Sequence, residues 1–277
     1  MELKSIPTGI SSLDLIIEGG FPSGSFTLLL GEVGAGSTEF AYSSAIMLSL
    51  IKEGVISAPG SGDITIPDSI CYVSVTRSEE DVLREVFESF TPEYYEAFKE
   101  NMVFMDFSEE YFRRSPFLFT DGSYSFNSLK GLGKEKGIVE SLVTFLNENA
   151  ENSLVIIDSL TDLVRMYTDL MKWQDLILFL KGFQKASKNW NGLTYALLTT
   201  GIFEVSKQVE IADCADGVLV FEWGEIGTAQ RQRTMYVKKF RGLLPRLELD
   251  NIAKFETKIT RNTGFEVSNV KMIMGRR

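Results

Sequence analysis

The 277-residue sequence predicts an α/β fold in which a mainly parallel sheet is flanked by helices and continues into a C-terminal antiparallel extension. Three observations support this prediction. Short apolar runs alternate with segments of helical periodicity. A glycine-rich loop joins the first strong apolar run to a helix. From residue 231 onward, apolar and polar residues alternate as they do in antiparallel strands.

Length and composition favour one domain over residues 1–277, with a core at about 8–225 and the sheet extension at about 231–273. Hydrophobic residues make up 44% of the chain and charged residues 24%, which is ordinary for a globular protein. No apolar run is long enough to span a bilayer, and the first residues lack the pattern of a secretory signal. We therefore expect a cytoplasmic protein that makes no membrane contact.

The N-terminal part predicts a short helix followed by the first core strand. Ser11 and Asp14 form a Ser-x-x-Asp pattern that predicts a capped helix start, and the Gly/Pro cluster at 19–24 predicts a loop. The strand at 26–30 leads through the glycine-rich loop into a helix that ends near Lys52. The side chains predicted to face inward from this helix are Phe40, Ala41, Ser44, Ala45, Leu48 and Ile51.

The middle of the chain repeats the alternation of strands and helices. Pro and Gly residues at 55–69 indicate an exposed excursion. Ser78 and Asp81 predict a capping box for a helix whose inward side chains are Val82, Leu83, Val86, Phe87 and Phe90. The remaining predicted elements are strands at 70–75, 102–107, 154–159, 194–200 and 217–221, helices at 138–149 and 170–189, and antiparallel strands at 233–240, 253–260 and 265–272.

The glycine-rich loop follows the phosphate-binding pattern G-x-x-x-x-G-K-[ST] at every position except one. Ser37 stands where the pattern has lysine, and Thr38 stands at the hydroxyl that contacts a metal ion. Glycines allow backbone N–H groups to turn toward a phosphate, and the following helix adds a favourable partial charge. The candidate nucleotide-binding residues are therefore Gly31, Glu32, Val33, Gly34, Ala35, Gly36, Ser37 and Thr38.

The loss of the lysine leaves two interpretations of this loop open. The lysine normally places a full positive charge at the β- and γ-phosphates, which serves both binding and transfer. Ser37 supplies at most a hydroxyl, whereas Glu32 and Glu39 add negative charge nearby. Glu39 can also satisfy the helix dipole itself. Either the loop still binds ATP or ADP with Mg²⁺, or it is a relic that binds no nucleotide.

Two further candidate residues follow strands that are predicted to lie beside the loop. Asp158 ends the buried strand LVIID, as a Walker-B aspartate does, and with Thr38 it would hold Mg²⁺. Arg77 follows the strand at 70–75. Because ligands bind at the carboxyl ends of parallel strands, Arg77 could clamp a phosphate with its guanidinium. A surface arginine without this role is the other interpretation.

The net charge of −10 is unevenly distributed along the chain. Residues 231–277 contain twelve Lys and Arg against four Asp and Glu, a net +8, so the rest of the chain carries −18. A basic segment attached to an acidic body can bind nucleic acid or a complementary subunit. The strongly acidic body disfavours nucleic acid as the partner.

Cysteine and histidine content excludes several classes of chemistry. The chain has no histidine, which rules out serine–histidine catalysis and histidine-ligated metals. Cys71 and Cys214 lie in apolar, strand-like surroundings, and we expect both to be buried free thiols.

The segment 109–133 is long, irregular and rich in aromatic residues. Loops of this length are usually functional or mobile. The segment is either a local aromatic mini-core or a docking surface for a protein partner.

Several sequence blocks occur in a fixed order: Gly9 with Leu13-Asp14, Gly19-Gly20-x-Pro22-x-Gly24, the P-loop, Val155-Ile156-Ile157-Asp158-Ser159-Leu160, Ala215-Asp216-Gly217-Val218 and Lys239-Phe240-Arg241-Gly242. Through these blocks the sequence resembles the KaiC-like branch of the RecA superfamily of P-loop ATPases from residue 8 to about 270. The resemblance implies a RecA-like P-loop NTPase core that forms homo-oligomeric rings, often hexamers, with ATP between neighbours. Lys239 and Arg241 match the pair that reaches the neighbour's γ-phosphate.

Two catalytic parts of that family are missing here. The family has lysine at the position of Ser37, and a Glu-Glu pair directly after the second core strand, one member of which activates water. Aligned without gaps, Thr76 and Arg77 occupy the positions of that pair. Glu79-Glu80 offers a second register, but the capping box at Ser78 favours the ungapped one. We therefore expect no catalytic residue in this site.

The sequence as a whole favours a KaiC-like RecA-fold protein that does not hydrolyse ATP. Such a protein would be a nucleotide-responsive or structural assembly protein in signalling or regulation. One alternative is an active ATPase in which Arg77, or a neighbour's Lys239 and Arg241, replaces the missing charge. The other alternative, a DNA recombinase-like protein, is disfavoured by the acidic body.

Overall fold

The computed structural model describes residues 4–58, 63–112, 136–168, 172–226, 230–241 and 254–268. The described strands are β1 (Ser5–Ile6), β2 (Phe21–Pro22), β3 (Ser25–Gly31), β4 (Ile70–Ser74), β5 (Met102–Asp106), β6 (Leu154–Asp158), β7 (Leu193–Thr199), β8 (Gly217–Ile226), β9 (Gln230–Phe240), β10 (Phe255–Thr260) and β11 (Gly264–Ser268). The described helices are α1 (Ser11–Ile16), α2 (Ser37–Lys52), α3 (Glu79–Ser89), α4 (Pro92–Glu100), α5 (Ser108–Phe112), α6 (Lys136–Asn149), α7 (Leu160–Thr168), α8 (Trp173–Trp190) and α9 (Val205–Cys214).

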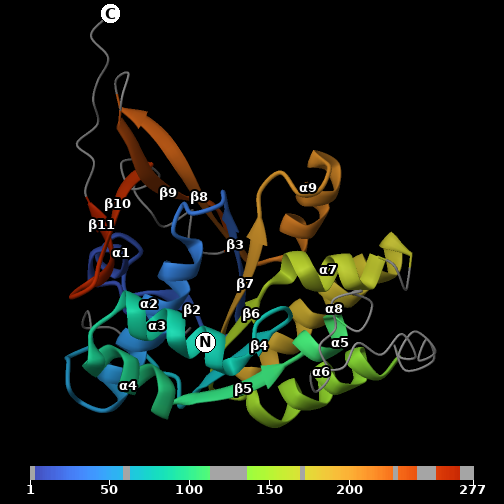
Figure 1. The fold of residues 1–277 in the computed structure, drawn as a ribbon, viewed down its shortest axis with the longest axis horizontal. Helices are drawn as coiled ribbons and strands as arrows, with labels where there is room; N and C mark the ends of the chain where they lie inside the picture. Colours follow the sequence, from blue (N-terminus) through green and yellow to red (C-terminus); the bar gives the residue numbers. More distant parts are fainter. Residues whose placement is uncertain are drawn as a thin grey trace, which may run out of the picture.

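A nine-stranded sheet with the order β11-β10-β9-β8-β3-β7-β6-β4-β5 forms the centre of the molecule (Figure 1). The strands from β8 to β5 in this order pair in parallel. The strands from β8 to β11 pair in antiparallel fashion. This arrangement confirms the predicted fold class, a mainly parallel sheet with an antiparallel C-terminal extension.

Alternating side chains of the parallel strands face two separate helical layers. On β3, Leu29 belongs to the core under α1, α2, α3 and α4, whereas Leu28 and Leu30 belong to the core under α6, α7, α8 and α9. On β6, Ile156 belongs to the first of these cores and Ile157 to the second. The two groups of helices lie on opposite sides of the sheet in Figure 1. Because both faces are covered, these strands read as continuous apolar runs in the sequence.

The predicted inward stripe of α2 is confirmed, since all of its members are buried except the half-buried Ile51. On α3, Ser78 and Asp81 form the predicted capping box. Phe87 is the exception on that helix, because its side chain is 54% exposed and packs edge-on against Tyr95 of α4. Both Cys71 and Cys214 are buried free thiols, as predicted.

Helices α4, α5, α7 and α9 have no counterpart in the sequence-based prediction, which took residues 109–112 of α5 as part of an irregular segment. Pro92 at the first position of α4 is a start signal that could have revealed this helix. Helix α7 begins only two residues after β6 ends, so its apolar residues merge with those of the strand. Helix α9 exposes Val205 and Val209 to solvent, which obscures its amphipathic pattern.

The predicted capping box at Ser11 and Asp14 is wrong. Helix α1 begins at Ser11, and its cap residue Ile10 makes no side-chain capping bond. The Asp14 carboxylate is buried, where it accepts hydrogen bonds from Thr8 N at 2.7 Å, Thr8 Oγ1 at 2.8 Å and Gly9 N at 3.0 Å. Asp14 therefore stabilises the turn that precedes the helix and not the helix start.

Parts of some predicted segments lie outside the described residues. Of the aromatic segment 109–133, only residues 109–112, within α5, are described. Residue 253 and residues 269–272 of the predicted antiparallel strands also lie outside. Within the described ranges, no helix has both the length and the apolar character needed to cross a membrane.

We predict that Asp14→Ala lowers the free energy of unfolding by about 2–5 kcal/mol, because buried N–H and O–H donors of Thr8 and Gly9 lose their acceptor. Urea unfolding followed by circular dichroism measures this change. The control is Asp68→Ala, which truncates an exposed carboxylate and should shift stability by less than about 0.5 kcal/mol. Equal effects of the two variants would contradict the conclusion that Asp14 stabilises the turn before α1.

Candidate functional site

The predicted site residues of three different strands meet at the carboxyl edge of the sheet. The P-loop follows β3, Arg77 follows β4, and Asp158 is the last residue of β6. Strand β6 lies between β4 and β7, and β7 lies beside β3. Backbone bonding continues past the strand ends, because Val75 N donates to Asp158 O at 2.9 Å. This edge is where open α/β sheets bind their ligands.

The backbone of the P-loop adopts conformations that require glycine at two points. Gly34 has φ +74° and Gly36, directly before α2, has φ +107°. A Cβ atom added to Gly36 would lie 3.2 Å from Ile259 Cδ1 and 3.2 Å from Phe265 Cε2. A Cβ added to Gly31 would lie only 2.6 Å from Ser37 Oγ, so the side chain that replaces the lysine folds back over this glycine.

Side chains and backbone of strands β8 and β9 donate hydrogen bonds to the P-loop. Trp223 N donates to Glu32 Oε2 at 3.1 Å, and Trp223 Nε1 donates to Val33 O at 3.1 Å. Arg233 Nε donates to Gly34 O at 2.9 Å. Trp223 and Arg233 are directly opposite each other in the β8–β9 ladder, with the guanidinium 4.8 Å from the centre of the indole ring. Three consecutive loop residues are thus anchored by contacts from within the chain.

The sequence analysis did not identify Trp223 and Arg233. Their function depends on the register of an antiparallel pair that is far from the loop in sequence. A basic and an aromatic residue near the end of two adjacent predicted strands is too common a pattern to point to the loop.

Arg77 lies at the centre of a cluster that joins two strands and two helices. Its Nη1 pairs with the Glu85 carboxylate of α3, and its Nη2 pairs with the Asp158 carboxylate of β6. Nη2 also lies 2.8 Å from Tyr42 OH of α2 and 3.1 Å from Tyr72 OH of β4. Arg77 is therefore not a freely solvated surface arginine, because its side chain is only 28% exposed.

The two tyrosines of this cluster complete its hydrogen bonding. Tyr72 OH donates to Asp158 Oδ2 at 2.5 Å, and Tyr42 OH donates to Glu85 Oε2 at 3.1 Å. Burial raises the pKa of both phenols, so both remain neutral donors at physiological pH. The cluster thus holds one guanidinium against two carboxylates.

The charge of Arg77 is secured by its surroundings. Burial has the largest single effect and lowers the pKa of the guanidinium, but attraction to Asp158, Tyr72, Tyr42 and Glu85 together outweighs it. The net result is a raised pKa, so Arg77 stays protonated throughout the accessible pH range.

Lys239 and Arg241 lie at the end of β9 and interact with the C-terminal end of α9. Lys239 Nζ donates to Ala212 O at 3.1 Å and to Asp213 O at 3.0 Å. Arg241 Nη2 donates to Asp213 O at 3.4 Å. Cations are favoured at this end of a helix, where carbonyl groups lack partners. Their predicted contact with a neighbouring subunit stays a prediction.

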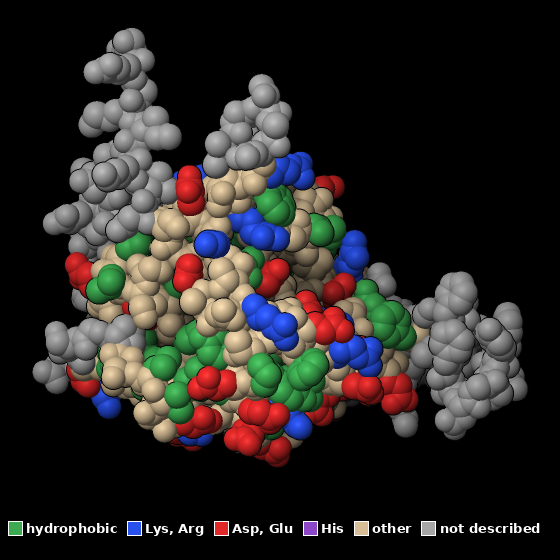
Figure 2. Space-filling view, turned by 60° about the vertical axis from the view of Figure 1, so that its left-hand side comes forward, with side chains coloured by type: hydrophobic (Ala, Val, Ile, Leu, Met, Phe, Trp, Pro, Cys, Tyr) green, Lys and Arg blue, Asp and Glu red, His purple; other side chains and the backbone are tan. Residues whose placement is uncertain are grey.

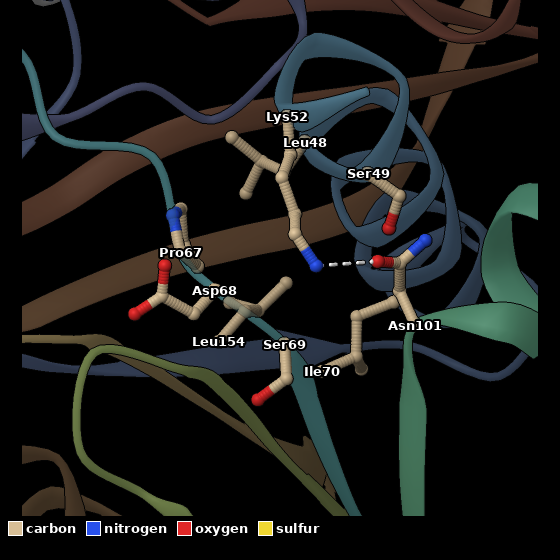
Figure 3. Close-up of a pocket in the computed structure, with 9 residues that line it drawn as sticks. All are labelled: Leu48, Ser49, Lys52, Pro67, Asp68, Ser69, Ile70, Asn101 and Leu154. Atoms are coloured by element: carbon tan, nitrogen blue, oxygen red, sulfur yellow. Dashed lines mark hydrogen bonds between the residues drawn. The ribbon is translucent and has the colours of Figure 1, made fainter.

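A small cavity between α2 and the sheet lies at the other end of the strands (Figure 3). Ile70 and Leu154, which line it, are the first residues of β4 and β6. Lys52 points toward Asn101 in Figure 3, and its Nζ donates to Asn101 Oδ1 at 2.9 Å. The cavity has a volume of about 10 Å³, which is room for about one water molecule, so it is no nucleotide site.

The fit of Mg²⁺ to this edge depends on Asp158. Thr38, the other predicted ligand, is the second residue of α2 and is half-buried. Asp158 Oδ2 already accepts from Tyr72 and Arg77, so a metal ion would have to share this carboxylate with a guanidinium. In the part of the chain that the structure describes, no three His, Cys, Asp or Glu side chains are grouped as metal ligands.

Comparison with solved structures identifies the fold. A KaiC-like protein from the hyperthermophilic archaeon Pyrococcus horikoshii superposes with a TM-score of 0.65 and 19% sequence identity. The match covers 96% of this chain and 99% of the archaeal one. No family model matches the sequence, and no curated protein matches it either. The chain therefore has the KaiC-like RecA fold, as the sequence blocks suggested.

We predict a double-mutant coupling energy of about 1–3 kcal/mol between Arg77→Ala and Asp158→Ala, because removing either partner takes a counter-charge away from a largely buried charge. The double variant should be less destabilised than the sum of the two single variants, as measured by urea unfolding.

The matched control is the exposed pair Arg84 and Glu80 on α3, for which the same cycle should give at most about 0.5 kcal/mol. A coupling at Arg77–Asp158 no larger than this control would show that the cluster does not organise the site.

Proposed function

We propose that this protein is a nucleotide-responsive or structural assembly protein with a degenerate P-loop site that does not hydrolyse ATP. The observation that carries the proposal is the position of Arg77. In the resemblance to KaiC-like ATPases, this position belongs to the Glu-Glu pair that activates water. Here it holds a cation that pairs with Asp158.

Hydrolysis needs both a base for water and positive charge at the transferred phosphate. Ser37 replaces the cation of the P-loop, and Thr76 and Arg77 replace the carboxylates. A guanidinium cannot accept a proton from water, because it is already fully protonated. Loss of both parts therefore supports a site that binds without turnover.

Nucleotide binding itself needs neither the P-loop lysine nor the base that activates water. The loop retains its glycines, its position before α2 and its placement at the carboxyl edge of the sheet. Backbone N–H groups and the helix dipole attract phosphate without the lysine. Anchoring by Trp223 and Arg233 keeps the loop in place before a ligand arrives, which lowers the entropic cost of binding. The proposed ligand is ATP or ADP.

Charge distribution supports assembly into homo-oligomers. The described residues 230–241 and 254–268 contain eight Lys and Arg against two Asp and Glu, whereas residues 79–100 contain two against eight. The first group lies on β9, β10 and β11 at one edge of the sheet, and the second on α3 and α4 near β5 at the other. In Figure 2, Asp and Glu side chains are most frequent along the lower border of the molecule.

A surface with complementary ends favours head-to-tail contact, which closes into a ring or continues as a filament. Lys239 and Arg241 belong to the basic edge, and in this proposal they face the neighbour's P-loop. With Glu39 at the start of α2 and Ser37 in place of lysine, they could meet a carboxylate there directly. The contact would then need nucleotide only weakly or not at all.

An active ATPase with relocated charges is the competing function. Arg77 is committed to Asp158 and Glu85 within the chain, so the charges would have to come from a neighbour's Lys239 and Arg241. The neighbour's Lys239 and Arg241 would supply positive charge only. The site would still lack a base that accepts a proton from water.

We predict ATP turnover at least about a hundredfold below that of ordinary ring ATPases, because a transition-state charge contact and the base are both absent. Phosphate release by purified protein measures this rate. Asp158→Asn is the control for contaminating activity, since a trace contaminant would be unaffected by it. Turnover at ordinary rates that Asp158→Asn abolishes would contradict the proposal.

We predict that light scattering at low salt finds a species several chains in mass, with or without ATP, and that rising salt dissociates it because exposed charges are screened. Lys239→Glu/Arg241→Glu should shift the equilibrium toward single chains. Lys172→Glu/Lys185→Glu, the same charge change at exposed positions of the α8 region, should not. A one-chain mass at low salt and high protein concentration would rule assembly out.

A further inference from the structure

The candidate nucleotide site contains a cation supplied by the chain itself. We infer that the Arg77 guanidinium takes the place of the divalent metal ion at Asp158, so that the site accepts a nucleoside di- or triphosphate without metal. This inference replaces the expectation that Thr38 and Asp158 together hold Mg²⁺.

The oxygens around Arg77 are the kind that a hard cation would bind. The guanidinium lies between the carboxylates of Asp158 and Glu85, and the hydroxyls of Tyr42 and Tyr72 lie 2.8 and 3.1 Å from Nη2. Carboxylate and neutral oxygen ligands are those that Mg²⁺ and Mn²⁺ prefer. In this chain the Arg77 guanidinium lies among those oxygens.

A metal ion at Asp158 would have to coexist with this guanidinium or displace it. Coexistence places a divalent and a monovalent cation at one carboxylate, and their repulsion is strong because Asp158 is only 12% exposed. Displacement removes Arg77 from two carboxylates and two hydroxyls at once. Both routes weaken metal binding.

The backbone around Arg77 keeps the side chain in this position. Arg77 N donates to Ser74 Oγ at 3.1 Å, at the end of β4. The next residue, Ser78, is the cap of α3, and its capping box with Asp81 fixes where the helix begins. Glu85 lies two turns further along the same helix. The Arg77 guanidinium therefore belongs to a short segment that is fixed at one side by the end of β4 and at the other by the start of α3.

The part of the inference that concerns nucleotide rests on the proposed function, whereas the part that concerns the metal does not. The metal is tested with Mn²⁺, whose free and bound forms are distinguished by electron paramagnetic resonance. The proteins are the wild type, Asp158→Asn, Arg77→Gln, Arg77→Gln/Asp158→Asn, and Arg84→Gln as the control on the exposed side of α3.

We expect the wild type and Arg84→Gln to bind no Mn²⁺ that depends on Asp158. Arg77→Gln should gain one bound Mn²⁺ at millimolar concentration, because two carboxylates lose their counter-charge. Mn²⁺ should also raise the melting temperature of Arg77→Gln but not that of the wild type. The added Asp158→Asn change should remove both effects.

Two results would overturn the inference. One is a bound Mn²⁺ in the wild type that Asp158→Asn removes. The other is a folded Arg77→Gln that binds no more Mn²⁺ than the wild type does. If Arg77→Gln does not fold, Arg77→Gln/Glu85→Gln is measured in its place, because it leaves only one carboxylate unpaired.

The nucleotide is tested by calorimetric titration of the wild type with ATP, once in MgCl₂ and once in EDTA. We expect dissociation constants that agree within about twofold, whereas a tenfold preference, about 1.4 kcal/mol, for the Mg²⁺ form would overturn the inference. Absence of ATP binding in both buffers would refute nucleotide binding in the proposed function, and the Mn²⁺ result would then decide the identity of the cation alone.

Discussion

The ion pair between Arg77 and Asp158 is the interaction on which the rest of the site depends. Asp158 ends a buried strand, and a carboxylate buried there without a counter-charge would cost stability. The chain supplies this charge from the segment after β4, and Tyr42 and Glu85 extend the contact to α2 and α3. The pair therefore joins the helix after the P-loop, the neighbouring strand and the neighbouring helix.

The P-loop and the Arg77 cluster share one physical property, since both are organised by the protein alone. Trp223 and Arg233 anchor the carbonyl oxygens of the loop from β8 and β9. A site that is held in this way loses little entropy when a ligand binds, but it also changes little in response. In the proposed assembly, a response to nucleotide would therefore be transmitted where the charges of neighbouring chains meet.

The sheet topology explains why the charge asymmetry along the chain becomes an asymmetry in space. The C-terminal strands add to β8 one after another, so the basic part of the sequence forms one edge of the sheet. Helices α3 and α4 come from the first half of the chain and lie near the other edge. A sequence with a basic end thus becomes a molecule with two unlike flanks.

The sequence alone determined the fold class, most strands and the sheet edge at which the candidate site lies. Buried parallel strands must be apolar on both faces, and a glycine-rich loop between a strand and a helix is rare by chance, so both patterns are visible without a structure. The sequence also places Ser37 where the phosphate-binding loop pattern has lysine.

Only the tertiary structure decided what several of these residues contact. Asp14 looked like a helix cap from its spacing, but it stabilises a turn, because the donors of Thr8 and Gly9 point at it in three dimensions. Arg77 could equally have been a phosphate clamp or a solvated side chain, and its partners come from strands and helices far apart in sequence. Trp223 and Arg233 reach the loop only through strand pairing. Local patterns specify elements, whereas the pairing of distant side chains depends on the register and packing of the whole sheet.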